Sequence, residues 1–339
     1  MSLVLILCVA LAALIGSTTA HAAPEDFFRG KTIRLVVGTP PGGGYDAYAR
    51  LVARHIVTYL PGHPTVIVTN MPGASGMNAT HWVWAQAPRD GTVFATFNKS
   101  EPFYQAIGQK GANFKTEELS WIGSLSQAAD TVNVLASSGV KSIEDLKKKE
   151  LVVGADSGGT MTLFPALLNA TIGTKFKIVT GYEGSAAVYH AIELGEVQGV
   201  GSTPWVTWKT MRPDWVRDGK ILALVQVGLK PEADLPGVPR LIDLAQNDEQ
   251  RRMFTFVSSV AAIERPYAAP PGIPAELLVT YRQAFTAMTK DKDFLAEAEK
   301  QNMDIDPQTG EQVEAIVRDI VNTPTAVVAK VKAVADEGR

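Results

Sequence analysis

Three glycine-containing segments hold residues whose types and spacing suit the binding of an anion. The first has glycines at 42–44, after an apolar run at 33–38 and before Asp46, which is predicted to cap a helix. Glycines let the backbone approach a ligand with its N–H groups uncovered, and the start of a helix carries partial positive charge. This segment therefore suits an anion. The alternative is a strand-to-helix turn that needs glycine only for its geometry.

The second segment, 156–162, repeats this design in the other half of the chain. It follows another apolar run and precedes a helical pattern at 163–170. A third segment, 181–185, precedes a helix predicted to extend to Leu194, with Gly195 as its C-cap. Two such helix starts, one in each half, are able to face each other across a cleft. The repetition favours ligand binding over turn geometry alone.

The motifs of several other chemistries do not fit this sequence. No Lys follows the glycines at 42–44, as a P-loop requires, and Asp46 and Ala47 replace the last glycine of a dinucleotide motif. Residues 156–159 read Asp-Ser-Gly-Gly, as in trypsin-like proteases, but His55 lies on a predicted helix with no β-barrel pattern around it. The histidines show no metal-ligand spacing. We therefore expect no metal, nucleotide or other cofactor.

Length and charge narrow the class of protein further. The 339 residues exceed an average domain and predict two lobes, and the net charge of −3 argues against a nucleic-acid partner.

An apolar run at 2–15 precedes Ala20-His21-Ala22, which predicts a secretory signal peptide over residues 1–22. This run lacks the usual Lys or Arg before it. An uncleaved anchor is the alternative, although the run is short for a membrane span.

Strand and helix patterns alternate along the chain, which predicts an α/β fold with mainly parallel sheets. The sequence assigns 23–130 to a first lobe, 131–252 to a second and 253–339 to a return into the first. Residues 121–135 are predicted to carry the crossing, and 255–260 a strand that returns. The expected strands are 33–38, 66–69, 92–97, 151–155, 197–200 and 221–227, and the expected helices are 46–60, 78–87, 142–146, 163–170, 185–194, 275–289 and 311–335.

A series of motifs carries a resemblance to a known family. They are Arg34-Leu-Val-Val37, Pro40-Pro-Gly-Gly43, Asn70-Met-Pro-Gly-Ala74, Asp90-Gly-Thr92, Gly154 to Thr160, Tyr182-Glu-Gly-Ser185 with Gly195-Glu-Val197, Leu235-Pro-Gly-Val-Pro239 and Pro270-Pro-Gly-Ile-Pro274. Their types and order resemble those of tripartite tricarboxylate transporter substrate-binding proteins, the Bug-type receptors. The resemblance covers essentially the whole mature chain.

This resemblance implies a type II periplasmic binding protein fold, in which two βαβ lobes enclose a ligand cleft. It further implies a periplasmic receptor that grips a ligand carboxylate between two glycine loops, partly through ordered waters, and passes it to a membrane permease. The sequence departs from the family at Tyr45, Leu163, Glu183 and Gln198, which usually are a small residue, His, Lys and Asp. These changes affect the distal half of the pocket, where Tyr45 and Trp205 favour an aromatic acid.

We expect ligand contacts from both lobes of a monomer, with an aliphatic dicarboxylate or an aromatic acid as ligand. The expected grip residues are Gly42, Gly43, Gly44, Tyr45, Ser157, Gly159 and Thr160, with Asn98, Ser100, Tyr182, Ser185, Thr203 and Trp205 as further candidates. Gly159→Val is expected to weaken binding about ten- to a hundredfold, with little effect on stability. No base–nucleophile pair is evident, so a non-enzyme is expected. A secreted hydrolase or transferase on the same fold and a solute sensor are the alternatives.

Overall fold

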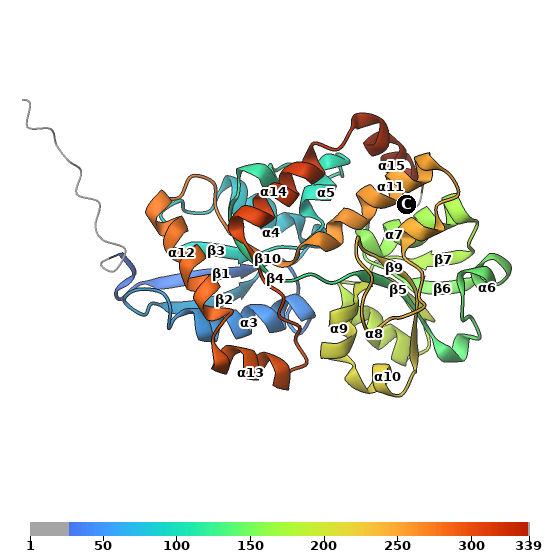
Figure 1. Ribbon diagram of the computed structural model, residues 1–339, viewed down its shortest axis with the longest axis horizontal. Coiled ribbons are helices and arrows are strands. Elements are labelled where there is room, and N and C mark those ends of the chain that lie inside the picture. The colour runs from blue at the N-terminus through green and yellow to red at the C-terminus, as the bar shows by residue number, and fades with distance from the viewer. Residues whose placement is uncertain (1–26, 338–339) are drawn as a thin grey trace, which may run out of the picture.

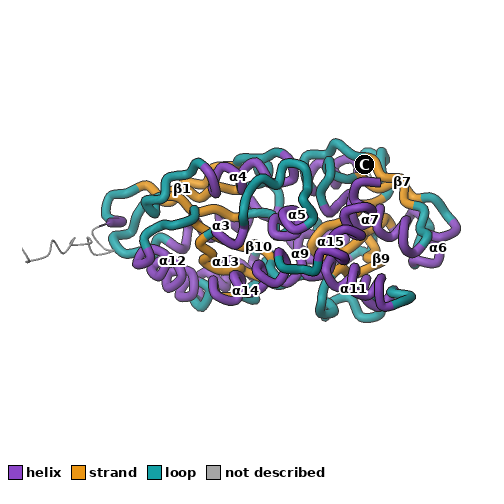
Figure 2. Tube along the Cα trace, turned by 90° about the horizontal axis from the view of Figure 1, so that it is seen from above, coloured by secondary structure: helices purple, strands orange, loops and turns teal. Residues whose placement is uncertain are grey.

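The computed structural model of this chain describes residues 27–337, which form two lobes side by side along the long axis (Figures 1 and 2). Each lobe is built on one mixed β-sheet with helices packed around it. The predicted signal peptide, 1–22, lies outside the described residues. No helix in the described part of the chain is long and apolar enough to cross a membrane. The predicted two-lobed α/β fold is confirmed.

In the first-lobe sheet, β1 (Thr32–Val37) lies second from one edge. β1 pairs in parallel with β2 (Thr65–Asn70) and β3 (Val93–Thr96), while β10 (Glu264–Ala269) is antiparallel to both β3 and β4 (Ser120–Ser126). Ile33, Leu35, Val36 and Val37 of β1 are buried. Side chains on both faces of the strand are covered because helices pack on both faces of the sheet. The strand order is β11 (Gln308–Thr309), β4 (Ser120–Ser126), β10 (Glu264–Ala269), β3 (Val93–Thr96), β1 (Thr32–Val37) and β2 (Thr65–Asn70).

The helix α3 (Gly44–Ile56) shows how sequence pattern places the helices of this lobe. Its buried residues Tyr48, Leu51 and Val52 share one face, while Arg50 is exposed. The apolar face packs into a core with Phe94 and Tyr267. The other helices that follow first-lobe strands are α4 (Met77–Ala85), α5 (Glu101–Ala106), α12 (Ala275–Met288), α13 (Lys292–Lys300) and α14 (Gly310–Val321).

The second-lobe sheet contains three parallel strands, β7, β6 and β8, followed by two antiparallel pairings. Its order is β7 (Phe176–Val179), β6 (Leu151–Gly154), β8 (Gly199–Pro204), β5 (Asp130–Leu135) and β9 (Ile221–Val227). Its helices are α6 (Ile143–Lys148), α7 (Thr160–Ile172), α8 (Ser185–Glu193), α9 (Trp205–Met211), α10 (Pro213–Arg217) and α11 (Asp248–Ser258). Leu194 is the C-cap of α8, and Gly195 follows it with a φ of 75°.

The chain crosses between the sheets twice within the described residues. The first crossing lies between β4 and β5, inside the predicted segment 121–135. The prediction of a returning strand at 255–260 is wrong, because these residues continue α11 and a short 3₁₀ turn, and the returning strand is β10. Asn247 caps α11 by accepting a hydrogen bond from Gln250, and Phe254 and Val257 bury one helical face. This helical spacing outweighs the β-branched residues of the segment.

The assignment of all of 253–339 to the first lobe is also wrong. The C-terminal helix α15 (Thr325–Glu337) packs against α7 and α11, beside the second lobe (Figure 1). Its buried residues Val331 and Ala335 belong to the same apolar core as Leu167 of α7. An isolated helix of this length is only marginally stable, so α15 depends on the packing of its apolar residues against α7 and α11.

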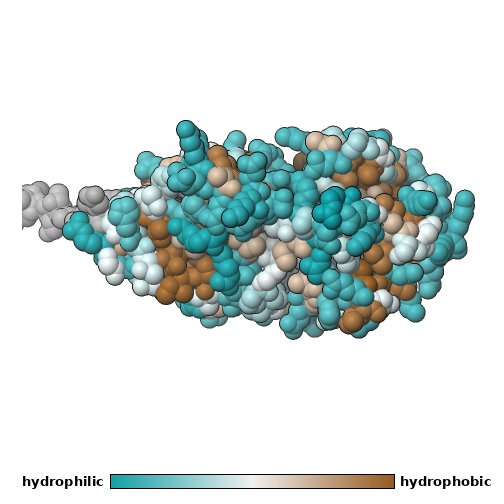
Figure 3. All heavy atoms as spheres, turned by 90° about the horizontal axis from the view of Figure 1, so that it is seen from below, coloured by the Kyte–Doolittle hydropathy of each residue, from teal (hydrophilic) through white to brown (hydrophobic). Residues whose placement is uncertain are grey.

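The outer surface is mainly hydrophilic on the face shown in Figure 3, where apolar residues gather in patches on each lobe. The exposed large apolar side chains among the described residues are scattered over the chain: Ile67, Leu194, Leu229, Val279 and Leu295. Single exposed apolar residues are normal in folded proteins.

Candidate functional site

A cavity of about 420 Å³ lies between the two lobes. Its size is within the range of small-ligand pockets, roughly 300–1,000 Å³. Of the residues expected from sequence, it is lined by Gly43, Gly44, Tyr45, Asn98, Ser157, Thr160, Tyr182, Ser185 and Thr203. These residues come from loops after β1, β3, β6 and β7 and from the end of β8. Folding therefore brings segments up to about half the chain apart into one cavity.

Four expected residues do not line this cavity. Gly42 turns its N–H away, donating to Oδ2 of Asp46 at 3.0 Å, so Asp46 holds the loop instead of serving as the helix N-cap. Ser100 and Trp205 are buried, with 1% and 5% of their surface exposed. The backbone of Gly159 forms a hydrogen bond with Asp156. The sequence patterns identified the loops correctly but did not reveal these internal partners.

The structure adds lining residues that the sequence interpretation did not include. The loop 72–76 is the largest addition, and four successive residues in it have positive φ: 117° at Gly73, 49° at Ala74, 56° at Ser75 and 103° at Gly76. A positive φ is costly for Ala74 and Ser75, which carry a Cβ, and strain of this kind is concentrated at functional sites. Gly73 and Gly76 were the signal in the sequence that could have identified this loop. Further added residues are Thr39, Pro40, Lys99, Asp130, Asp156, Met161, Glu183 and Ser202.

Two helix starts face the cavity, one from each lobe. α3 begins at Gly44 and α8 at Ser185, and neither N-cap, Gly43 or Gly184, offers a side chain to the first N–H groups. These N–H groups have no acceptor within their own helix. Gly44 is also required by packing, because a Cβ there would lie 2.8 Å from Nη2 of Arg265. The arrangement suits an anion held by neutral donors.

The start of α7 differs from the expectation of an open glycine loop. Its first N–H, at Thr160, donates to the hydroxyl of Tyr104 at 3.1 Å. Nε2 of Gln109 donates to the carbonyl of Gly158 at 2.7 Å, and Oγ of Ser75 donates to Oδ2 of Asp156, also at 2.7 Å. Residues from before the first crossing thus occupy the polar groups of the second glycine loop.

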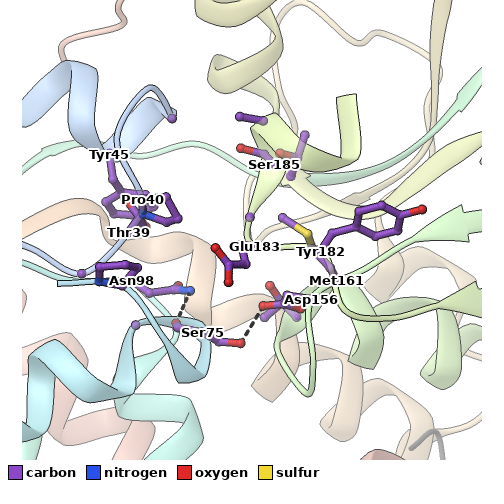
Figure 4. Close-up of a pocket in the computed structure, with 18 of the residues that line it drawn as sticks. Thr39, Pro40, Tyr45, Ser75, Asn98, Asp156, Met161, Tyr182, Glu183 and Ser185 are labelled. Atoms are coloured by element: carbon purple, nitrogen blue, oxygen red, sulfur yellow. Dashed lines mark hydrogen bonds between the residues drawn. The ribbon is translucent and has the colours of Figure 1, made fainter. Parts of the chain in front are cut away.

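Asp156 is enclosed at the edge of the cavity (Figure 4). Burial raises the pKa of its carboxyl, and the hydrogen bonds from Ser75 and Gly159 offset this only in part. Its Oδ1 atom is buried and has no hydrogen-bond partner among the described residues. The raised pKa favours a protonated carboxyl at this position over a wider pH range than in a free aspartate.

The floor of the cavity is a buried network of charges. Nζ of Lys99 lies 2.9 Å from Oδ1 of Asp130 and 2.6 Å from Oε2 of Glu264. Burial alone would lower the pKa of Lys99, but the two carboxylates outweigh it and raise the pKa. Asp130 opens β5 and Glu264 opens β10, so Lys99 joins the two crossing segments.

Arg265 extends this network beneath Tyr45. Its guanidinium pairs with Glu264, donates to Oγ1 of Thr207 at 2.8 Å, and lies 4.2 Å from the centre of the Tyr45 ring. The hydroxyl of Tyr45 accepts a hydrogen bond of 3.0 Å from the N–H of Lys99. The ring of Tyr45 is therefore fixed as one wall of the cavity.

The site offers binding groups more than reactive ones. Ser75, Ser157, Ser185 and Ser202 line the cavity, but no His does. Across residues 27–337, no group of three His, Cys, Asp or Glu is arranged to hold a metal ion. The arrangement is typical of a pocket that binds a small polar molecule.

Comparisons with known proteins agree with this geometry. The profile of the tripartite tricarboxylate transporter family receptor matches residues 48–332. A UPF0065 protein of Cupriavidus necator is 26% identical over 316 residues, which cover 91% of this chain and 90% of that protein. The structure of the periplasmic binding protein BugD matches with a TM-score of 0.69 at 18% identity, covering 90% of this chain and 97% of that one. A Rhodopseudomonas palustris protein solved with adipate matches with a TM-score of 0.68 at 19% identity, covering 89% and 97%.

Proposed function

The chain belongs to the tripartite tricarboxylate transporter receptor family, and on that premise we propose that it captures a small organic carboxylate between its lobes and delivers it to a membrane permease. The observation that carries this proposal is the cavity with one helix start from each lobe, α3 and α8. A carboxylate bound there accepts hydrogen bonds from both lobes at once. Ligand binding thereby favours closure of the lobes about the two crossings.

The walls of the cavity support an aliphatic dicarboxylate or an aromatic acid as ligand. Tyr45 and Tyr182 line it together with Pro40 and Met161, so apolar surface is available beside the polar groups. Trp205 packs among Trp208 and Tyr189 in a core cluster and does not take this part. Adipate in the R. palustris protein is an example of a carboxylate held by the same fold.

Native mass spectrometry of protein purified from cells tests this function directly. We expect a monomer whose mass exceeds that of the chain by one small acid, and isothermal titration with the identified acid should show one site per chain. Chelators should leave this binding unchanged. A purified protein that binds no organic carboxylate would overturn the proposal.

Delivery and compartment need separate measurements. Vesicles that contain the permease should take up the acid only when the receptor is added. Protein recovered from the periplasm should begin at Ala23, since residues 1–22 carry the signal-peptide pattern. An intact Met1 on that protein would contradict the proposed secretion route. Turnover of a carboxylate ester or amide would instead favour an enzyme.

A further inference from the structure

The cavity lining has acidic side chains in excess, because the one lysine among its described residues is already paired with carboxylates of the protein. The charged lining residues are Lys99, Asp130, Asp156 and Glu183. Lys99 is 3% exposed and is held by Asp130 and by Glu264 behind it. The nearby Arg265 is 1% exposed and pairs with Glu264. No lining cation among the described residues is therefore left to face a ligand.

Glu183 is the acidic residue with free access to the cavity. Its side chain is exposed, and its carboxylate points into the space between Asn98 and Asp156 (Figure 4). Within the described part of the chain it has no ion-pair or hydrogen-bond partner. It lies directly before Gly184, the N-cap of α8. A negative charge thus stands in the middle of a cavity that both lobes line.

Asp156 is a second, independent observation that favours a positively charged ligand group on this side of the cavity. It adds a further carboxyl group, and its enclosed Oδ1 atom has no hydrogen-bond partner among residues 27–337. Like charges at close range repel, more strongly where water is excluded. A second carboxylate on the ligand would meet the carboxylate of Glu183 here, beside the acidic Asp156 and with no lining cation among the described residues to offset the repulsion. A positively charged group would meet attraction at the same place.

We propose that the natural ligand is an amino-substituted carboxylate, whose carboxylate binds the helix starts and whose ammonium group binds Glu183. This inference rests on the proposed receptor function and names its ligand class. The helix starts of α3 and α8 supply neutral N–H donors for the anionic end. Glu183 supplies an acceptor for the cationic end, and a charged donor and acceptor form the stronger class of hydrogen bond. A simple dicarboxylate, which the cavity walls also admit, is then the weaker ligand of a pair that differs only in this group.

Matched probes that differ only in this group test the proposal. 4-Aminobutanoate and pentanedioate have the same length, with ammonium replacing one carboxylate, and so do 3-aminopropanoate and butanedioate. 4-(Aminomethyl)benzoate and 4-(carboxymethyl)benzoate form an aromatic pair. Isothermal titration of the mature protein at pH 7 should show that at least one amino acid of these pairs binds ten times or more tighter than its dicarboxylate partner.

Variants of Glu183 locate the effect. Glu183→Gln keeps the shape and removes the charge, and should weaken the amino-substituted probe by about ten- to a hundredfold. Glu183→Lys should reverse the preference toward the dicarboxylate. Glu150→Gln removes the same charge from an exposed residue outside the cavity and should change neither affinity. Melting curves verify that all variants are folded.

The outcomes separate this inference from the function on which it rests. Dicarboxylates that bind as well as or better than their amino partners, or unchanged affinities in Glu183→Gln, would overturn the ligand class while leaving a carboxylate receptor. Butylamine that binds as tightly as 4-aminobutanoate would show that the carboxylate is not recognised, which contradicts the receptor function and supports the role of Glu183. Failure of every probe to bind would count against both.

Discussion

Ser75 and Asp156 are joined across the cleft by a hydrogen bond of 2.7 Å, although they belong to different lobes. Ser75 lies in the loop 72–76 of the first lobe, where its φ is 56°. Asp156 lies in the loop that follows β6 in the second lobe, two residues after the strand ends. The bond therefore links two loops that both line the cavity, and it connects ligand access to the relative position of the lobes.

Ser75→Ala removes this link. We expect the free energy of unfolding to fall by about 1–3 kcal/mol, because Asp156 loses a hydrogen bond in an enclosed place. Small-angle X-ray scattering should also show a larger radius of gyration without ligand, as the lobes separate more easily. Ser137→Ala, at an exposed serine of the second lobe, is the matched control. A radius unchanged from wild type would mean that other contacts set the lobe position.

Gly159→Val is now expected to affect stability as well as affinity. Gly159 has a φ of −90°, so the backbone tolerates valine, but a Cβ would lie 2.1 Å from Oδ2 of Asp156. Asp156 must then move and lose Ser75. Chemical denaturation should show destabilisation, and the double variant with Ser75→Ala should be less destabilised than the sum of the two single changes. Full additivity would show that Gly159 acts independently of this contact.

Gly43 and Gly44 should respond differently to alanine. A Cβ on Gly44 meets Nη2 of Arg265 at 2.8 Å and Oγ1 of Thr207 at 3.2 Å, and crowding of this kind costs about 1–3 kcal/mol. A Cβ on Gly43 has its nearest neighbour, the carbonyl of Pro40, at 4.0 Å. We expect Gly44→Ala to lower the melting temperature clearly and Gly43→Ala to change stability by less than about 1 kcal/mol. Equal losses would show that the two positions are not distinguished by packing.

Glu101 should make stability depend on pH. It is fully buried next to Gly76, and burial raises the pKa of its carboxyl well above the usual value, which the nearby hydroxyl of Thr80 offsets only in part. A raised folded-state pKa contributes stability below the unfolded pKa of about 4.3, and this contribution is lost as pH rises through the folded pKa. Glu101→Gln should therefore gain stability relative to wild type as pH rises, by up to about 1.4 kcal/mol per pH unit.

Urea unfolding of both proteins between pH 4 and pH 8 measures this difference. The exposed Glu150→Gln serves as control and should show no widening gap. A stability difference that stays constant over the whole range would mean that the carboxyl of Glu101 keeps its ordinary pKa.

Local patterns in the sequence determined most of the elements and the positions of the glycine loops. The strand at 221–227 follows from a short and nearly continuous apolar run, and the helix over 275–288 follows from apolar residues that recur about every 3.6 positions. Both patterns are local and need no distant partner. The series of motifs from Arg34 to Pro274 likewise indicated the family and the two-lobed fold. The strand expected at 255–260 failed because its short apolar run suits a buried helix equally well.

Only the tertiary structure decided which groups of those loops remain open to a ligand. The N–H of Thr160 is occupied by Tyr104, 56 positions away, and Asp156 meets Ser75 at a separation of 81. The docking of α15 on α7 and the pairing of Lys99 with Glu264 are equally long-range. A backbone N–H is the same chemical group wherever it occurs, so its availability depends on which distant side chain the fold brings against it. The sequence therefore predicted where the loops lie, whereas the packing of the two lobes determined that the carboxylate of Glu183 lines the cavity without an ion-pair partner among residues 27–337.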